Sequence, residues 1–163
     1  MKRLILVRHA KSNWNQPLVS DHDRIINDTG KSDAKLIGKY LYQAHYTVSH
    51  MISSSAIRTL QTAKIISKEI KFEDSIETQS LIYNSAAEKI LNLIYNINNK
   101  FECVILVGHN PTITELANHI SNINIDNIPT SGTMIIDFEC QWKQISNNGK
   151  LIDFITPDKL KAV

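Results

Sequence analysis

Two histidines and two arginines in this 163-residue sequence have side chains suited to handling an anion. Arg8 and His9 are adjacent, whereas Arg58 and His109 lie far along the chain. A guanidinium group presents a rigid fork of N–H donors that matches two oxygens of a phosphate. A neutral imidazole is abundant near pH 7 and can attack phosphorus as a nucleophile. If the fold brings the four side chains together, positioning and charge alone could transfer a phosphoryl group without a metal.

Each of these residues also has an ordinary structural interpretation when it is taken alone. His9 could be a structural histidine, Arg58 a solvated helix residue, and the turn at His109 the simple end of a strand. Zinc binding is another use of paired histidines. However, zinc needs three or four ligands, and neighbouring arginines would repel the ion. The positions that the fold gives to these residues therefore decide between the interpretations.

Short apolar runs alternate with helical segments along the chain, and this alternation predicts the fold. The apolar runs are uninterrupted, as in CVILV at 103–107, which is typical of strands buried on both faces. The pattern predicts a three-layer α/β/α sandwich around a mostly parallel sheet. We expect strands over 4–7, 48–52, 75–81, 103–107, 133–138 and 151–155, and helices over 31–44, 56–70, 86–97 and 112–120. Residues 139–163 are weakly patterned, and the sequence leaves open whether they add a strand or only wrap the domain.

The four candidate residues all come shortly after predicted strands. Arg8 and His9 follow the first strand, Ser53–Ser55 follow the second and lead to Arg58, and Gly108–Pro111 follow the strand at 103–107. In sheets of this kind, ligands bind at the carboxyl ends of the strands. We therefore expect the two histidines and the two arginines to meet at one edge of the sheet.

Two helices are expected to begin at the same edge and to direct backbone N–H groups toward an anion. Ser55 is a candidate N-cap for the first helix. For the second helix, Asn110 and Pro111 suit the N-cap and the first helical position, while Thr112 and Glu115 also fit a capping box.

Length and composition predict one soluble globular domain over residues 1–163. Hydrophobic residues make up 42% of the chain and charged residues 21%, which is the ordinary globular range. A net charge of +2 is too mildly basic to indicate nucleic-acid binding. The apolar run Leu4–Val7 is too short for a signal peptide or a membrane span, so we expect a cytoplasmic protein with no membrane partner.

Four blocks of the sequence resemble motifs of the histidine phosphatase superfamily, which also holds the phosphoglycerate mutases. LVRHAKS at 6–12 resembles the RHG signature, and SSSAIRTLQTA at 53–63 resembles the SSPxxRxxQTA block. VGHNP at 107–111 and DHDRIINDTG at 21–30 are similar to the SixA-type phosphohistidine phosphatases, and PTSG at 129–132 also fits. The resemblance covers residues 4 to about 138 and implies a phosphoglycerate mutase-like fold.

The resemblance also implies a role for each candidate residue. His9 would be the nucleophile that becomes phosphorylated, and Arg8, Arg58 and His109 would bind and stabilise the phosphoryl group. No cofactor and no metal are implied. The candidates for substrate binding are Ser12, Asn15 and His22. Ser12 and Asn15 are included because the corresponding residues lie close to this pocket in relatives.

The sequence departs from the family pattern at several positions, none of which removes a catalytic group. Ala10 replaces a glycine, Ser55 replaces a proline, and Ile25–Ile26 stand where Pro-Leu is usual. Many larger members carry a glutamate proton donor, but residues 81–85 read LIYNS without a carboxylate. The general acid is therefore unassigned, although His22 or Asp23 could supply a proton if their loop folds over the pocket.

The implied function is a phosphatase that acts through a phosphohistidine intermediate. The favoured substrate is phosphohistidine on a protein, because the chain has no spare residues for the pocket-covering segments of the mutases. A phosphatase for small phosphorylated molecules is the first alternative. A non-catalytic module that only binds phosphate is the second, and the presence of both His9 and His109 argues against it.

Overall fold

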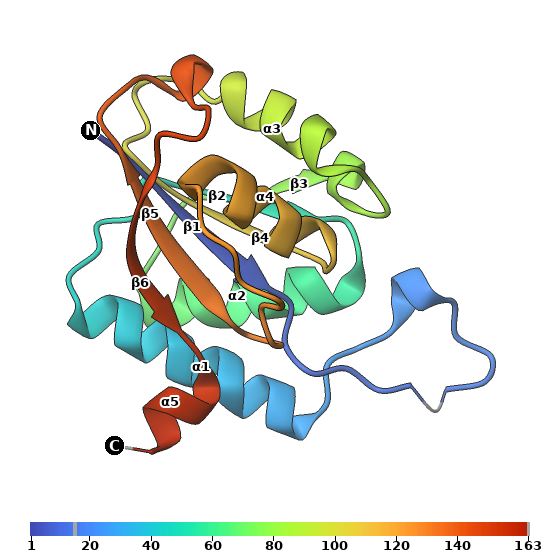
Figure 1. Ribbon diagram of the computed structural model, residues 1–163. Coiled ribbons are helices and arrows are strands. Elements are labelled where there is room, and N and C mark those ends of the chain that lie inside the picture. Colours follow the sequence, from blue (N-terminus) through green and yellow to red (C-terminus); the bar gives the residue numbers. More distant parts are fainter. Residues whose placement is uncertain (15, 163) are drawn as a thin grey trace.

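The computed structural model describes residues 1–14 and 16–162, and its centre is a six-stranded sheet (Figure 1). The strand order is β3-β2-β4-β1-β5-β6, in which neighbours from β3 to β1 pair in parallel and the β1–β5 and β5–β6 pairs are antiparallel. The strands are β1 (Lys2–Arg8), β2 (His50–Ser54), β3 (Glu77–Gln79), β4 (Cys103–Gly108), β5 (Thr133–Phe138) and β6 (Lys150–Ile155). The helices are α1 (Asp28–Gln43), α2 (Ile57–Glu69), α3 (Ala87–Tyr95), α4 (Thr112–Ser121) and α5 (Pro157–Lys161), with short 3-10 turns at Asp21–Asp23, Ser80–Ile82 and Trp142–Gln144.

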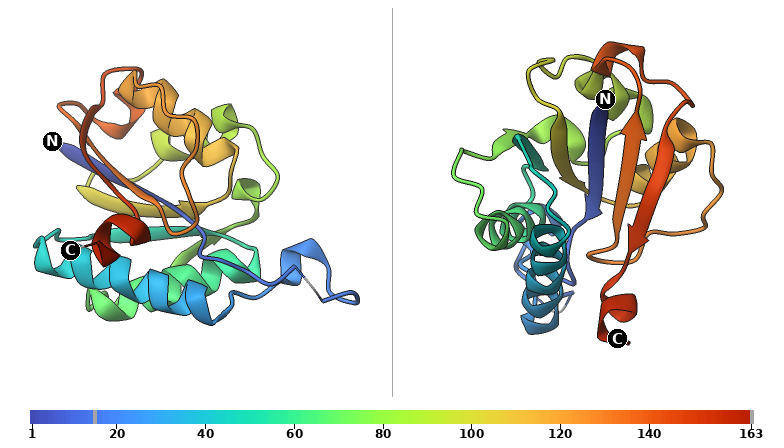
Figure 2. Two further views of the ribbon diagram at one scale, coloured as in Figure 1. Left: turned by 60° about the horizontal axis from the view of Figure 1, so that its bottom comes forward. Right: turned by 90° about the vertical axis from the view of Figure 1, so that its left-hand side faces the viewer.

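Helices cover both faces of the sheet, as the two views in Figure 2 show. Side chains alternate between the faces along each strand. Leu4 and Leu6 pack in one apolar cluster with α3 and α4, while Ile5 and Val7 pack in a second cluster with α1 and α2. All four are fully buried, and truncating one such residue to alanine typically costs about 2–5 kcal/mol of unfolding free energy. The predicted three-layer α/β/α sandwich is thus confirmed.

The strand order brings the three candidate loops side by side. β2, β4 and β1 are neighbours in the sheet and run in the same direction. Arg8 pairs with Gly108 across β1 and β4, and Ser53 pairs with Val107 across β2 and β4. Because the registers match, the residues that follow these strands emerge at one level of the same sheet edge.

The carboxyl-terminal segment both adds a strand and packs against the core. β6 extends the sheet, and the 3-10 turn before it buries Trp142 completely. The Trp142 indole N–H donates to the Phe101 carbonyl at 2.8 Å, which fixes this turn next to the beginning of β4.

The predicted strand at 75–81 is shorter than expected, because only Glu77–Gln79 pair with β2. None of the helices described is long and apolar enough to cross a membrane.

Candidate active site

His9 lies just beyond the end of β1, and its ring is held in one orientation. Its backbone N–H donates to the Gly108 carbonyl at 3.0 Å, and its ring Nδ1 lies 2.8 Å from the Ala10 carbonyl oxygen. A carbonyl oxygen can only accept, so Nδ1 carries the ring proton in this contact. Among the described residues, Nε2 of His9 has no hydrogen-bond partner in the protein, and its lone pair is available for attack.

Burial and positive charge keep His9 neutral. The side chain is almost completely buried, and burial lowers the pKa of His9 to about 4, with help from the charges of Arg58 and Arg8. An imidazole with this pKa is unprotonated throughout the neutral range. His9 therefore meets the first requirement of a nucleophile, a free electron pair at pH 7.

Arg58 and His109 form a contact beside His9. Arg58 lies in the first turn of α2, and its Nη2 donates to His109 Nδ1 at 3.3 Å. His109 Nε2 then donates to the Ser54 hydroxyl at 2.8 Å, so this ring is also fixed. The ring centroids of His9 and His109 are 5.4 Å apart, and burial followed by the Arg58 charge lowers the pKa of His109 to about 3. One guanidinium and two neutral imidazoles thus share one location.

A cavity of about 510 Å³ opens over these residues. Arg8 contributes a second guanidinium to its wall and is held by a 2.9 Å bond from Nη1 to the Ile128 carbonyl. Most of the remaining wall is polar, as expected for an anion site rather than an apolar ligand site. The residues that line the cavity are Arg8, His9, Lys11, Ser12, Trp14, Asp21, Arg24, Asn27, Arg58, Asn84, His109, Asn110 and Thr130.

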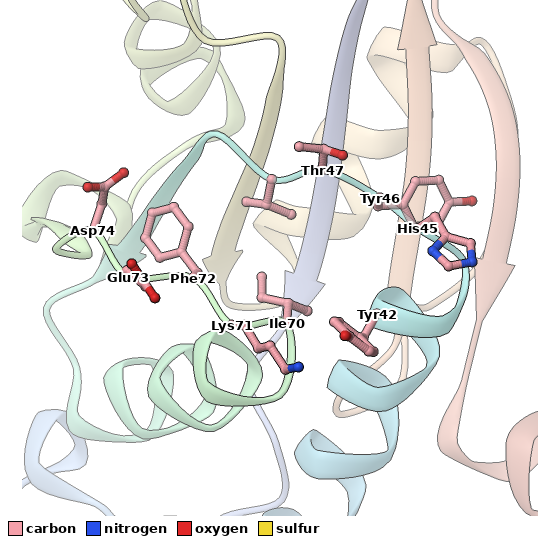
Figure 3. A pocket seen from close by; sticks show the side chains of 10 residues that line it. Tyr42, His45, Tyr46, Thr47, Ile70, Lys71, Phe72, Glu73 and Asp74 are labelled. Carbon is pink, nitrogen blue, oxygen red and sulfur yellow. The ribbon is translucent and has the colours of Figure 1, made fainter.

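A second cavity of about 420 Å³ lies at the opposite ends of the parallel strands (Figure 3). It is lined mainly by the segments 42–48 and 70–74, which lead into β2 and β3. Tyr42, Tyr46 and Phe72 supply aromatic rings there, and none of the four candidate residues takes part. The four residues for which the sequence predicts chemistry therefore all line the first cavity.

Comparison with known proteins identifies the family. The family model of the histidine phosphatase superfamily (branch 1) matches residues 4–82. The candidate phosphohistidine phosphatase SixA of Agrobacterium tumefaciens has 30% sequence identity and a TM-score of 0.84, over 96% of this chain and 98% of that chain. The chain belongs to the histidine phosphatase superfamily.

A further structure and a further sequence relative are similar to the chain over most of its length. A structure of the protein histidine phosphatase SixA complexed with tungstate gives a TM-score of 0.85 at 16% identity, over 97% of this chain and 99% of that one. An uncharacterised chloroplast protein of Arabidopsis thaliana is 27% identical over 171 residues, which cover 96% of this chain and 78% of that protein. The phosphoglycerate mutase-like fold predicted for the chain is confirmed.

Of the predicted substrate-binding residues that the structure describes, only Ser12 is found in the cavity wall of this member of the superfamily. Ser12 lines the cavity and accepts a hydrogen bond from the Arg24 guanidinium. His22 lies outside the cavity lining, with Nε2 at 2.9 Å from the Ser55 hydroxyl, and its Nδ1 lies 3.3 Å from Asp23. Asn15 lies outside the described residues.

The sequence did not single out Asp21 and Arg24 as site residues, although both lie in the DHDR block. Arg24 is buried, and its Nε donates to Asp21 at 3.0 Å. The Asp21 carboxylate also accepts from Arg58 Nη2 at 3.1 Å and from the Tyr83 hydroxyl at 2.6 Å. The hydrogen bond from Tyr83 and the two arginines lower the pKa of Asp21 to about 2. Asp21 is therefore an anion that orders the arginines, and it has no proton to give at neutral pH.

Both helices begin at the cavity without the predicted side-chain caps. The expectation for Ser55 is wrong: Ala56 is the N-cap of α2, and the Ser55 hydroxyl faces His22 instead. Neither alternative for α4 holds, because Pro111 is the N-cap and no side chain bonds the first amides. Asn110 Oδ1 instead accepts from the Thr114 hydroxyl at 2.8 Å. The Ala56 N–H donates to the Ser54 hydroxyl at 3.3 Å, and the Ile113 N–H donates to the His109 carbonyl at 2.8 Å. The other first-turn N–H groups of α2 and α4 have no side-chain acceptor and can interact with an anion.

The lowered histidine pKa values can be measured directly. In an NMR titration of the imidazole resonances, His9 is expected to protonate with a midpoint near pH 4 and His109 near pH 3. Both rings stay neutral as the pH falls from 8 to about 5 because the protonated form is disfavoured by burial and by the arginines. Arg58→Gln removes one of these charges, so both midpoints should rise. A midpoint at the ordinary value of about 6.5 for His9 would contradict the buried, electropositive site.

Proposed function

We propose that this chain is a metal-independent phosphatase in which His9 is the nucleophile, and that residues 1–163 form one histidine phosphatase domain. Membership of the superfamily and the SixA-like structures support phosphatase activity. The observation that carries the mechanism is the hydrogen bond from His9 Nδ1 to the Ala10 carbonyl, which leaves Nε2 unbonded beside Arg58 and His109.

The reaction has two displacements at phosphorus. In the first, the Nε2 electron pair of His9 forms the N–P bond while the bond to the leaving group breaks and that group takes the electron pair. In the second, water attacks the phosphohistidine, loses a proton to solvent, and releases phosphate and neutral His9. Arg8, Arg58 and the α2 and α4 amides stabilise the negative charge of the transferring group in both steps.

The lack of a proton donor for the leaving group at Asp21 and His109 favours phosphohistidine as the substrate. The pKa values of Asp21 and His109 are about 2 and about 3, so at neutral pH Asp21 is a carboxylate and His109 a neutral imidazole, and neither serves as a general acid. An alkoxide leaving group needs a proton from the enzyme. A phosphorylated imidazole instead can carry a proton on its other ring nitrogen near pH 7 and can leave as neutral imidazole. We therefore propose a phosphohistidine side chain of a protein as the preferred substrate.

The dependence of the rate on the leaving group tests this preference. With His9 as nucleophile and no acid, kcat/KM should fall by about 10²–10⁴ from 4-nitrophenyl phosphate to an alkyl phosphate, the usual contribution of a general acid. A phosphohistidine peptide should be hydrolysed at least as well as the nitrophenyl ester. Equal rates for the alkyl and nitrophenyl esters would show that a proton donor exists and would favour the small-molecule phosphatase. All activities should survive a chelator, and a requirement for added metal would contradict the mechanism.

A further inference from the structure

The segment 11–27, here called the arm, leaves the sheet after β1 and projects from the body of the molecule before it reaches α1 (Figures 1 and 2). Its base is a paired stem. Ser12 and Ile26 form an antiparallel bridge, and the Asn13 N–H donates to the Ile25 carbonyl at 3.0 Å. On the other side of the bridge, the Asn27 N–H donates to the Lys11 carbonyl at 2.9 Å. Backbone pairing thus anchors the base of the arm.

The tip of the arm presents apolar side chains to solvent. The Val19 N–H donates to the Gln16 carbonyl at 3.1 Å and closes a turn that carries Leu18, which is 99% exposed. Trp14 is 78% exposed, and Val19 and Ile25 are also exposed. Of the eight large apolar side chains that are exposed among the described residues, these four lie in the arm. Such a concentration of exposed apolar groups on one segment marks an interaction surface.

This apolar surface begins at the catalytic cavity itself. Trp14 lines the cavity, and its ring packs on the Arg24 guanidinium at 3.8 Å from the centroid. Arg24 is fixed in turn by Asp21 and Ser12. The Trp14 ring is therefore held in the wall of the cavity, and the exposed Leu18 follows it four positions later in the same arm.

We propose that the arm is the docking surface for a protein substrate, and that it binds an apolar stretch of polypeptide next to the phosphorylated side chain. This inference rests on the proposed phosphatase function. A small phosphorylated molecule fits within the cavity of about 510 Å³ and leaves Leu18 in water. A polypeptide whose phosphorylated side chain reaches His9 continues beyond the cavity and can cover the arm. The paired stem and the Gln16–Val19 turn restrict the arm before binding, which reduces the entropy lost on docking.

The experiment compares two phosphohistidine peptides of equal length and charge, one with leucine and valine beside the phosphohistidine and one with serine and glycine. The wild-type chain should have a kcat/KM about tenfold higher for the apolar peptide, which corresponds to about 1.4 kcal/mol. In the Leu18→Ser/Val19→Ser double variant, this ratio should fall toward one because Leu18 and Val19 no longer offer apolar area, while Trp14 and Ile25 remain. Turnover of 4-nitrophenyl phosphate should be unchanged, because neither residue lines the cavity.

Ile152→Ser is the matched control, since Ile152 is exposed to 40% on the edge strand β6 and should leave the peptide preference intact. Equal kcat/KM for both peptides with the wild-type chain, or an unchanged preference in the double variant, would overturn the docking role while leaving the phosphatase in place. If the wild-type chain hydrolyses neither peptide nor 4-nitrophenyl phosphate, the proposed function itself fails. A wild-type dimer that the double variant makes monomeric, with no change in peptide preference, would assign the arm to self-association and overturn the inference.

Discussion

Replacing His9 with alanine is expected to lower turnover of 4-nitrophenyl phosphate and of a phosphohistidine peptide by at least about 10³-fold, because the covalent route disappears with the nucleophile. The other anion-binding groups remain in His9→Ala, so the variant should still bind inorganic phosphate. Brief exposure of the wild-type chain to a labelled phosphodonor, followed by rapid denaturation, should trap an acid-labile and base-stable label on His9. The variant should carry no label.

Controls separate the loss of the nucleophile from a general disturbance. His9 is buried, and its Nδ1–H is bonded to the Ala10 carbonyl, so alanine leaves that oxygen without its partner. His9→Asn keeps a short side chain with N–H donors, and it should be as inactive as the alanine variant with a thermal unfolding midpoint closer to wild type. His119→Ala removes an exposed histidine of α4 and should keep full activity and full labelling. Substantial turnover in both His9 variants would rule out the phosphohistidine intermediate.

The layered fold could be predicted because its signals are local. The run at Cys103–Gly108 is apolar at nearly every position and forms a strand that is buried throughout. The predicted strand at 133–138 agrees with β5, and the predicted start of α4 at Thr112 is correct. The starts of the helices are harder to predict from the sequence. Ser55 has a side chain typical of an N-cap, but its hydroxyl contacts His22, which is distant in the sequence. Local sequence preference carries no information about that contact.

The central residues of the site could also be predicted, because each follows a strand and the strands are neighbours. The network around Asp21 could not, since Asp21, Arg24 and Tyr83 come from a projecting arm and from the loop after β3. An acidic residue near an anion site gives no signal of its own in a sequence. The DHDR block was the available signal, and only the hydrogen bonds to two arginines show what it does.

Replacing Arg58 with alanine is expected to lower kcat by about 10²–10³, the range found when one charged or oxyanion-binding donor is removed. Arg58 is buried at the start of α2, and Asp21 holds it through two hydrogen bonds, from Nη1 to the Asp21 backbone carbonyl at 2.6 Å and from Nη2 to the Asp21 carboxylate at 3.1 Å. These hydrogen bonds fix the Arg58 guanidinium before the substrate binds. The guanidinium therefore does not have to reorient to stabilise the transferring phosphoryl group. Steady-state kinetics with 4-nitrophenyl phosphate measure the loss.

A lysine at the same position distinguishes the shape of the guanidinium from its charge. Arg58→Lys keeps one positive charge but cannot bind two phosphate oxygens while it also contacts Asp21, so its kcat should lie between alanine and wild type. Lys64→Ala, at an exposed position of the same helix, should be neutral in both kcat and thermal unfolding. Wild-type kcat in Arg58→Ala would show that Arg8 and the helix amides alone stabilise the transferring group. The structural reason for expecting otherwise is that Arg58 contacts both His109 and Asp21, so its loss disrupts a hydrogen-bonded network as well as removing a charge.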